Sequence, residues 1–288
     1  MPDFTFDAIG TSWTVTTAGP VTEPVRAAVL ELVDAYDRTY SRFRQDSVIA
    51  ALAAAPGTVE LPSSAVPLLR LFDALDRLTG GAVNPLVGHS LERLGYDAAY
   101  SFASSGPSPA PGWSSAASWQ PRGDRTVLST RVPATLDIGA AGKGQLVDLV
   151  FALLQDAGHR ELAVDAGSDL RHAGSDPLRI ALEHPYDSTR AIGVLPLQDR
   201  ALCASAANRR QWGDGLHHIV DALTGRPVDT VAATWVLADD AMTADGLATA
   251  LFFTDPGTLA QQFAFDYVRM SSDGRATFSP AMAGVLFS

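Results

Sequence analysis

The alternation of apolar and polar positions divides the chain into strands and helices. The opening segment FTFDAIGTSWTVTT alternates on both sides of Gly10, which predicts two strands joined by a tight turn. Pro24 is expected to begin a helix. The apolar positions that follow recur with helical spacing and place one apolar face on it: Val25, Ala28, Val29, Leu32, Val33 and Tyr36.

Two more helices are predicted in the first third of the chain. Asp46 or Ser47 is suited to cap a short helix that runs through Leu52. A longer helix is expected from about residue 64 to residue 78, because Gly80-Gly81 follows it and glycine commonly ends helices.

The remainder mixes strands with helices. Residues 101–123 are rich in Ser, Pro, Ala and Gly, which predicts an irregular surface crossing. The pattern then predicts a strand (TLDI), a glycine loop, a helix over 145–156 and a strand (ELAVD). Further strands are expected at RIALEH, AIGVLPL, ALCAS, HHIVDA and AATWVLA, before a helix over 241–253, a second short helix and a C-terminal hairpin.

This mixture predicts the α+β (mixed α/β) class, in one compact domain over residues 1–288. Apolar residues make up 47% of the chain and charged residues 18%, so a sizeable core is expected. The net charge of -11 disfavours binding to nucleic acid or to anionic membranes. No apolar run approaches the ~18 residues of a membrane span, and no signal peptide is visible, so a cytoplasmic location is expected.

The first candidate for chemistry is the loop Asp137-Ile-Gly-Ala-Ala-Gly-Lys143-Gly144, between a predicted strand and a predicted helix. Glycines expose backbone N–H groups, and the start of a helix carries a positive dipole end, so the loop is suited to hold phosphate. The spacing is not that of a P-loop. A purely structural turn remains the alternative, although Lys143 is the only lysine of the chain.

A second candidate lies in the segment DDAMTADGLAT. Asp245 and Thr249 are four residues apart, so a carboxylate and a hydroxyl project from the same helix face. Both are hard oxygen donors of the kind that Mg²⁺ binds. An acidic turn that only complements the helix dipole is the alternative.

A third candidate is the segment His217-His218-Ile219. Neighbouring residues of a strand point to opposite faces, so one histidine can face a pocket while the other meets solvent. A neutral histidine can accept a proton from a hydroxyl nucleophile, although an ordinary surface histidine is the alternative. Two weaker signals are Phe43, an aromatic between arginines, and the turn GGAVNPLVG, which contains Asn84.

Taken together, these segments resemble the FAD:protein FMN transferase family, also called ApbE. YSRFRQDSVIAAL resembles its F-S-R-F-x-x-D-S-x-L block, GGAVNPLVG its G-x-F-D-P-T-V-G, and TLDIGAAGKGQLVD its D-L-G-G-I-A-K-G-Y-A-V-D. VDAGSDLRHAG is similar to N-x-G-G-D-I-x-x-x-G, HHIVDALTGRPV to S-H-I-I-D-P-x-T-G-x-P, and DDAMTADGLATALFF to D-A-x-x-A-D-x-L-x-T-A-L-F. The six blocks occur in order over nearly the whole chain.

The resemblance implies an ApbE-like domain with mixed sheets, packed helices and FAD in a central cleft. It also implies Mg²⁺-dependent transfer of FMN from FAD to a Thr or Ser hydroxyl of an acceptor flavoprotein with a D-x-x-[ST]-x-T site, and release of AMP. The implied metal ligands are Gly142, Asp245, Ala248 and Thr249, and the implied flavin and adenine contacts are Phe43, Ala82, Val83, Asn84, Gln145 and Ile219. His218 is the implied base, and we add the hypothesis that Lys143 stabilises charge on the phosphates.

Two departures from the family pattern bear on this interpretation. Asn84 stands where the family has aspartate, which keeps a hydrogen-bonding carbonyl but loses the charge. Gly142 stands where the family has alanine, which keeps the backbone carbonyl. Two activities remain as alternatives: a FAD pyrophosphatase that gives FMN and AMP, and a non-catalytic FAD-binding protein.

Overall fold

The computed structural model describes residues 3–287, and the chain begins with the hairpin that the alternation predicts. Strands β1 (Asp3–Ala8) and β2 (Thr11–Thr17) pair antiparallel. Ile9 and Gly10 join them with φ values of 42° and 79°, the left-handed conformation of a two-residue hairpin turn.

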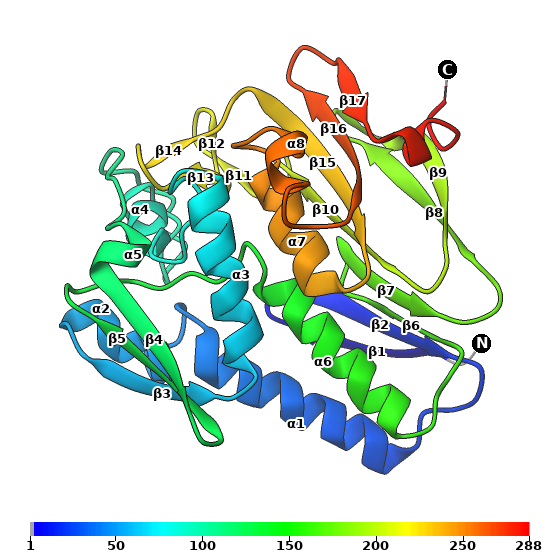
Figure 1. Cartoon of the computed structure of the whole chain (residues 1–288), viewed down its shortest axis with the longest axis horizontal. Coiled ribbons are helices and arrows are strands. Elements are labelled where there is room, and N and C mark those ends of the chain that lie inside the picture. Colours follow the sequence, from blue (N-terminus) through cyan, green and yellow to red (C-terminus); the bar gives the residue numbers. More distant parts are fainter. Residues whose placement is uncertain (1–2, 288) are drawn as a thin grey trace.

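This hairpin forms one edge of an eight-stranded sheet with the order β1-β2-β6-β7-β10-β15-β16-β17, in which every pair is antiparallel (Figure 1). The other strands of the sheet are β6 (Leu162–Asp165), β7 (Asp169–Ala173), β10 (Ala201–Ala206), β15 (Val231–Ala238), β16 (Asp266–Ser271) and β17 (Ala276–Phe278).

Strand β15 is buried along its whole length because both faces of the sheet are covered. Its side chains alternate between two hydrophobic clusters. Val236 belongs to the main core with helix α7 (Ala241–Ala250), whereas Trp235 and Leu237 pack with the hairpin β8 (Leu178–His184) and β9 (Asp187–Leu197) on the other face.

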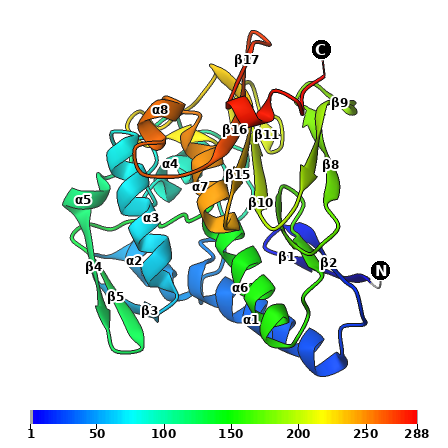
Figure 2. The ribbon, with the colours of Figure 1, turned by 45° about the vertical axis from the view of Figure 1, so that its right-hand side comes forward.

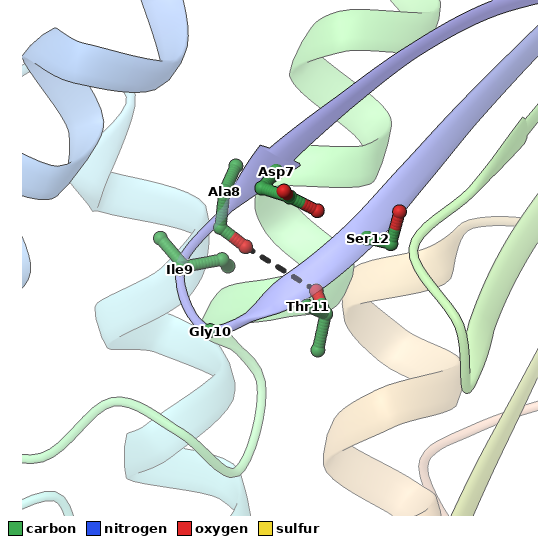
Figure 3. A pocket seen from close by; sticks show the side chains of 6 residues that line it. All are labelled: Asp7, Ala8, Ile9, Gly10, Thr11 and Ser12. Carbon is green, nitrogen blue, oxygen red and sulfur yellow. Dashed lines mark hydrogen bonds between the residues drawn. The ribbon is translucent and has the colours of Figure 1, made fainter.

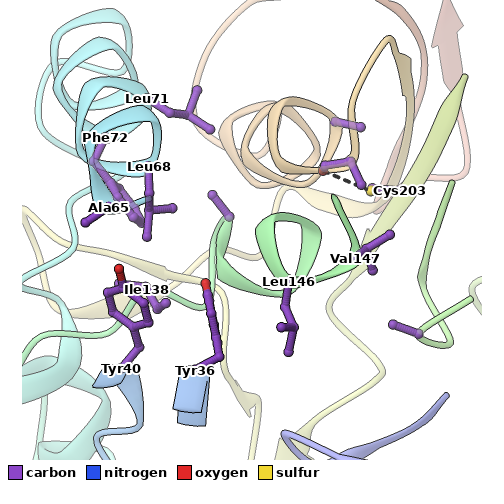
Figure 4. Packing of buried hydrophobic residues seen from close by; sticks show 14 of the residues in the cluster. Tyr36, Tyr40, Ala65, Leu68, Leu71, Phe72, Ile138, Leu146, Val147 and Cys203 are labelled. Carbon is purple, nitrogen blue, oxygen red and sulfur yellow. Dashed lines mark hydrogen bonds between the residues drawn. The ribbon is translucent and has the colours of Figure 1, made fainter. Parts of the chain in front are cut away.

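Helices α6 (Gly142–Asp156) and α7 (Ala241–Ala250) lie together against the first face of the sheet (Figure 2). Helices α1 (Glu23–Tyr40) and α3 (Ala65–Leu78) pack outside them. Figure 4 shows the main core between these helices, with Tyr36 and Tyr40 of α1, Phe72 of α3 and Leu146 of α6 directed into it.

The remaining elements surround this centre. A three-stranded sheet, β3-β5-β4, and two short pairs, β11-β12 and β13-β14, accompany several short helices. Their bounds are η1 (Val48–Ala50), α2 (Ala51–Ala54), β3 (Thr58–Pro62), α4 (Gly88–Arg93), α5 (Trp113–Ala116), β4 (Ala117–Arg122), β5 (Arg125–Thr130), β11 (Gln211–Trp212), β12 (Leu216–His217), β13 (Val220–Asp221), β14 (Arg226–Pro227), α8 (Pro256–Leu259) and η2 (Pro280–Met282).

The predicted α+β class is confirmed, and the structure differs from the sequence-based prediction at several boundaries. TLDI is not a strand: it runs beside Pro85, whose carbonyl accepts the Asp137 amide at 2.8 Å, and pairs with no sheet. The irregular crossing ends at residue 112 rather than 123, because residues 113–122 form α5 and β4. The sequence of β4 has only a weak strand pattern, and its pairing with β5 makes it a strand. Strand β7 was not predicted, and HHIVDA is interrupted at His218 and Ile219.

Two predicted helices also have different ends. Helix α6 begins at Gly142 instead of 145, and α7 ends at Ala250 instead of 253, where the last turn tightens. Within residues 3–287, none of the helices has the length and apolar character needed to cross a bilayer.

Candidate functional site

The site begins where α6 and α7 come into close contact. A Cβ placed on Gly144 would lie 2.2 Å from the Ala241 carbonyl oxygen, so this approach requires glycine. The Gly144 amide donates to a carboxylate oxygen of Asp245 at 3.0 Å. The glycine loop and the acidic helix, which lie about a hundred residues apart in the sequence, therefore form one structure.

A buried cluster of charged groups surrounds this junction. Lys143 forms an ion pair with Asp169 of β7, and its Nζ also donates to Ser168 at 2.7 Å. Burial, reinforced by the nearby Asp169, raises the pKa of Asp245 well above its usual range. Burial opposes the charge of Lys143, but the Asp169 and Asp245 carboxylates outweigh it and raise the pKa of the lysine. The Lys143 ammonium is thus paired with Asp169, and Asp245 is a second buried carboxyl group close to both.

The four predicted metal ligands lie at this junction. Asp245, Ala248 and Thr249 follow one another on α7, and the Thr249 hydroxyl donates to the Ala140 carbonyl of the glycine loop at 3.4 Å. Gly142 stands two residues before Gly144, whose amide binds Asp245. In residues 3–287, no group of three or more His, Cys, Asp or Glu side chains could hold a metal. A cation here would therefore use carboxylate, hydroxyl and carbonyl oxygens, a hard donor set that fits Mg²⁺.

Phe43 lies in a cluster of aromatic rings at the other end of the glycine loop. The Tyr100 ring stacks on it with centroids 5.2 Å apart and planes inclined by 4°, and Tyr96 meets it edge-on at 5.5 Å. Trp212 stacks on Tyr96 at 5.3 Å, and Phe102 lies against Trp212. The predicted flavin contact is therefore one member of a larger group of stacked rings, the aromatic cluster.

A buried ion pair connects the aromatic cluster to the glycine loop. The Arg42 guanidinium lies over the Phe43 ring, 4.1 Å from its centroid, and donates to Asp137 at 2.5 Å and to the Tyr96 carbonyl at 2.8 Å. Burial opposes ionisation of Asp137, but Arg42 outweighs it and lowers the pKa of the carboxyl group. Asp137 also accepts from the Gly139 amide at 2.7 Å, so Arg42 and the loop hold one another in place.

The two histidines have different environments, although the continuous strand on which the prediction rested ends at His217, and His218 lies outside it. His217 is buried, and its Nε2 bonds the Val228 carbonyl at 2.9 Å. The Nδ1 atom of His218 is also buried, yet it has no hydrogen-bond partner among residues 3–287. Burial, together with the cationic Arg210, lowers the pKa of His218 to about 3. Its ring is therefore neutral at neutral pH.

Three other predicted contacts lie beside these histidines. Ala82 and Val83 are buried in the turn after α3, and the Ala82 carbonyl accepts from the Ala222 amide at 3.1 Å. Ile219 is buried against Val231. The turn and the histidine segment thus lie side by side.

The side chains of Asn84 and Gln145 form hydrogen bonds within the protein. The Asn84 amide donates to the Pro111 carbonyl at 2.7 Å and accepts from the Leu86 amide at 2.8 Å. The Gln145 amide donates to the Ser64 carbonyl at 2.7 Å. Gln145 therefore lies between α3 and α6 instead of at the aromatic cluster.

Sequence reasoning missed three charged residues of the site. These are Asp169, Arg42 and Arg210, and the partner of each lies well away from it in the chain. Arg210 donates to the Tyr96 hydroxyl at 3.1 Å. The only signals for Asp169 and Arg42 are their places in the VDAGSDLRHAG and YSRFRQDS blocks.

The turn of the N-terminal hairpin lines a separate hollow of about 440 Å³ (Figure 3). Its lining residues are Asp7 to Ser12, and the Thr11 hydroxyl donates to the Ala8 carbonyl at 3.3 Å across the turn. None of the predicted site residues lines this hollow.

The sequence model of the ApbE family matches residues 9–266. A protein named FAD:protein FMN transferase from Rhodobacter capsulatus is 31% identical over 168 residues, 54% of this chain and 32% of that protein. One of the same name from Vibrio cholerae is 36% identical over 134 residues, 43% of this chain and 40% of that protein. The chain spans less than half the length of these two relatives. A third, from Klebsiella pneumoniae, is 25% identical over 86% of this chain and 77% of its own length.

Solved structures show the same fold. The ApbE protein of Thermotoga maritima has a TM-score of 0.84 at 23% identity, with 100% of this chain and 99% of that chain covered. The flavin transferase ApbE from Vibrio cholerae has a TM-score of 0.79 at 23% identity, with 99% of each chain covered.

Proposed function

The chain belongs to the ApbE family, and from that premise we propose that it transfers FMN from FAD to a Thr or Ser hydroxyl of an acceptor protein, in a Mg²⁺-dependent reaction that releases AMP. The observation that carries the proposal is the glycine loop, which connects two environments. Asp137 binds Arg42 beneath the Phe43 ring, and Gly144 binds Asp245. A ring-binding surface and a buried oxygen-donor site are thus attached to the two ends of one eight-residue segment.

In this proposal, Asp245, Thr249 and the carbonyls of Gly142 and Ala248 hold Mg²⁺, which neutralises charge on the pyrophosphate when bound. The flavin takes the place of the exposed Tyr100 ring on Phe43, and stacking on Phe43 orients it. The acidic chain needs such local elements to bind an anionic dinucleotide. Lys143 is held by Asp169 and Ser168, so its expected contribution is to balance the charge of the two carboxyl groups beside the phosphates.

In this proposal the neutral His218 accepts a proton. As the acceptor hydroxyl oxygen forms a bond to the FMN phosphorus, the bond from that phosphorus to the AMP phosphate oxygen breaks, and the hydroxyl proton passes to His218. A ring with a pKa of about 3 is a weak base, and the negative charge of a bound pyrophosphate raises that pKa toward the working pH.

The acceptor is proposed to be another protein. Two segments of this chain approach the D-x-x-[ST]-x-T pattern, DALTGR and DAMTAD, and both lack its final threonine. In the second, the Thr243 hydroxyl donates to Asp240 at 3.0 Å as part of the start of α7, so it is engaged in the structure.

The test is incubation of the purified chain with FAD, Mg²⁺ and a protein or peptide that carries D-G-x-T-A-T, followed by intact-mass measurement. An adduct of FMN mass, with an equal amount of AMP, is expected. If free FMN and AMP appear without an adduct on any acceptor tested, the activity is that of a FAD pyrophosphatase and not of a transferase. Bound FAD without cleavage would indicate a FAD-binding protein.

His218→Ala is expected to reduce transfer by about 10²- to 10⁴-fold, the usual contribution of a positioned general base. The same variant should bind FAD as the unaltered chain does, because Phe43 and the oxygen donors remain. If transfer persists unchanged, the base is a different residue.

A further inference from the structure

The two backbone carbonyls among the predicted metal ligands are each held by a buried hydroxyl group from another element. Tyr36 of α1 donates to the Gly142 carbonyl at 2.8 Å, and Thr234 of β15 donates to the Ala248 carbonyl at 2.7 Å. Tyr36 is 7% exposed and Thr234 is fully buried. Neither hydroxyl is itself among the predicted ligands.

The Ala248 carbonyl is free of the usual helical hydrogen bond. In a continued α-helix the Phe252 amide would donate to Ala248, but it donates to the Thr249 carbonyl at 3.1 Å instead. The tightened last turn leaves the Ala248 oxygen to the Thr234 hydroxyl. A carbonyl oxygen has two lone pairs, so one of them remains for a further ligand.

The surroundings of Gly142 are tightly packed on the side of Tyr36 and Ile138. A Cβ at this position would lie 2.5 Å from Ile138 and 3.3 Å from the Tyr36 hydroxyl. The same hydroxyl lies 2.9 Å from Oε1 of Gln145. Figure 4 shows the rings of Tyr36 and Tyr40 rising side by side from α1 with both hydroxyls directed away from that helix.

We propose that Tyr36 and Thr234 are positioning residues for the divalent cation. Each fixes the peptide plane of one carbonyl ligand, Gly142 or Ala248, so that the oxygen keeps its orientation before the cation binds. Groups that orient metal ligands in this way typically change metal affinity by about 10- to 100-fold when they are removed. The inference rests on the metal site of the proposed function, but it concerns residues outside that ligand set.

The chain supplies matched controls for both hydroxyls. Tyr40 lies one turn after Tyr36 with ring centroids 4.7 Å apart, and Thr126 is as deeply buried as Thr234. Neither the Tyr40 nor the Thr126 hydroxyl has a hydrogen-bond partner in the part of the chain that the structure describes. Tyr36→Phe is therefore compared with Tyr40→Phe, and Thr234→Val with Thr126→Val.

The experiment measures binding of Mn²⁺, as a stand-in for Mg²⁺, to the full chain by electron paramagnetic resonance, together with the Mg²⁺ dependence of transfer. Tyr36→Phe and Thr234→Val should each bind Mn²⁺ about 10- to 100-fold more weakly, and excess Mg²⁺ should restore most of the rate. Tyr40→Phe and Thr126→Val should bind Mn²⁺ as the unaltered chain does. Thr234→Ser keeps the hydroxyl and should recover the affinity.

Equal Mn²⁺ affinity in Tyr36→Phe, Thr234→Val and their controls would overturn the inference while leaving the metal site intact. An equal loss in the controls would also overturn it, since the effect would then be general packing. If Tyr36→Phe does not fold, the comparison of Thr234→Val with Thr234→Ser still tests the inference, because Thr234 lies on β15 and not on α1. Absence of Mn²⁺ binding in the unaltered chain would reject the proposed metal site itself, and the inference with it.

Discussion

The two ends of the glycine loop are built in contrasting ways. Its C-terminal end enters α6 and meets the buried charge cluster of Lys143, Asp169 and Asp245, all of them on helices or a central strand. Its N-terminal end meets the aromatic cluster, most of which lies on loops. There Tyr100 and Phe102 are each 48% exposed and have left-handed φ values of 49° and 51°.

The difference follows from the kind of ligand that each end would hold. Charges removed from water interact strongly and lose much energy when a partner is misplaced, so they need fixed geometry. Stacked rings tolerate sliding and tilting, so a ring-binding surface can be built from loops. Strained backbone in exposed aromatic residues is typical of a functional surface rather than of a core.

The substitution with the largest expected effect tests whether the charge cluster depends on its single cation. Lys143→Met would leave two buried carboxyl groups without a counter-charge, which should reduce the free energy of unfolding by about 3–5 kcal/mol. Arg210→Met, at the aromatic cluster, removes an exposed cation and should cost less than about 1 kcal/mol. Urea unfolding measures the free energy of unfolding of both variants. Similar losses in the two would show that the two ends of the loop do not differ in their dependence on a cation.

A second test compares glycines at the two ends. Gly144→Ala forces a methyl group against the Ala241 carbonyl and should destabilise the fold by about 3 kcal/mol, with loss of Mn²⁺ binding. Gly106→Ala, four residues after Phe102 of the aromatic cluster in the sequence, adds a methyl group in open space at a φ of +92°. Only backbone strain of about 1 kcal/mol is expected there, and Mn²⁺ binding should not change. Normal Mn²⁺ binding by Gly144→Ala would show that close contact between α6 and α7 is unnecessary.

A third test separates ring binding from metal binding. Phe43→Ala should weaken FMN binding about tenfold, because a stacked ring contributes roughly 1–3 kcal/mol, and should leave Mn²⁺ affinity unchanged. Flavin fluorescence quenching gives the affinity. Phe102→Ala, which removes an exposed ring at the edge of the cluster, should have a smaller effect. If both ligands bind more weakly to Phe43→Ala, the two ends are coupled through the loop.

The smallest effect concerns pH. The pKa of His218 is about 3 in the folded chain and near ~6.5 when unfolded. Between these values only the unfolded chain binds the proton, so stability is greatest above the unfolded pKa and falls as pH decreases, by about 0.7 kcal/mol between pH 7 and pH 6. His218→Gln should flatten this part of the dependence of Tm on pH. Burial also lowers the pKa values of His172 and His217, so some slope should remain. An unchanged slope would show that His218 is not buried as described.

The sequence predicted the parts of the fold whose signal is local. The hairpin around Gly10, helix α3 and most of β15 follow from periodicity and from turn residues. It missed β7, because VDAGSDLRHAG has little alternation and becomes a strand only through its pairing with β6 and β10. TLDI has the composition of a strand, but the Arg42–Asp137 ion pair and the Pro85 contact hold it outside any sheet.

The sequence by itself determined the class of the fold, the family blocks and the residue types that could bind a cation or accept a proton, since these depend on composition and spacing along the chain. Only the tertiary structure decided which partners these residues have. Tyr36 occupies an apolar position in the helical pattern of α1, and nothing nearby in the sequence indicates that its hydroxyl would meet Gly142, 106 residues away. Lys143 is conspicuous in the sequence as the only lysine, but its pairing with Asp169 depends on how α6 lies against β7. Such contacts depend on packing between distant segments, which local periodicity does not specify.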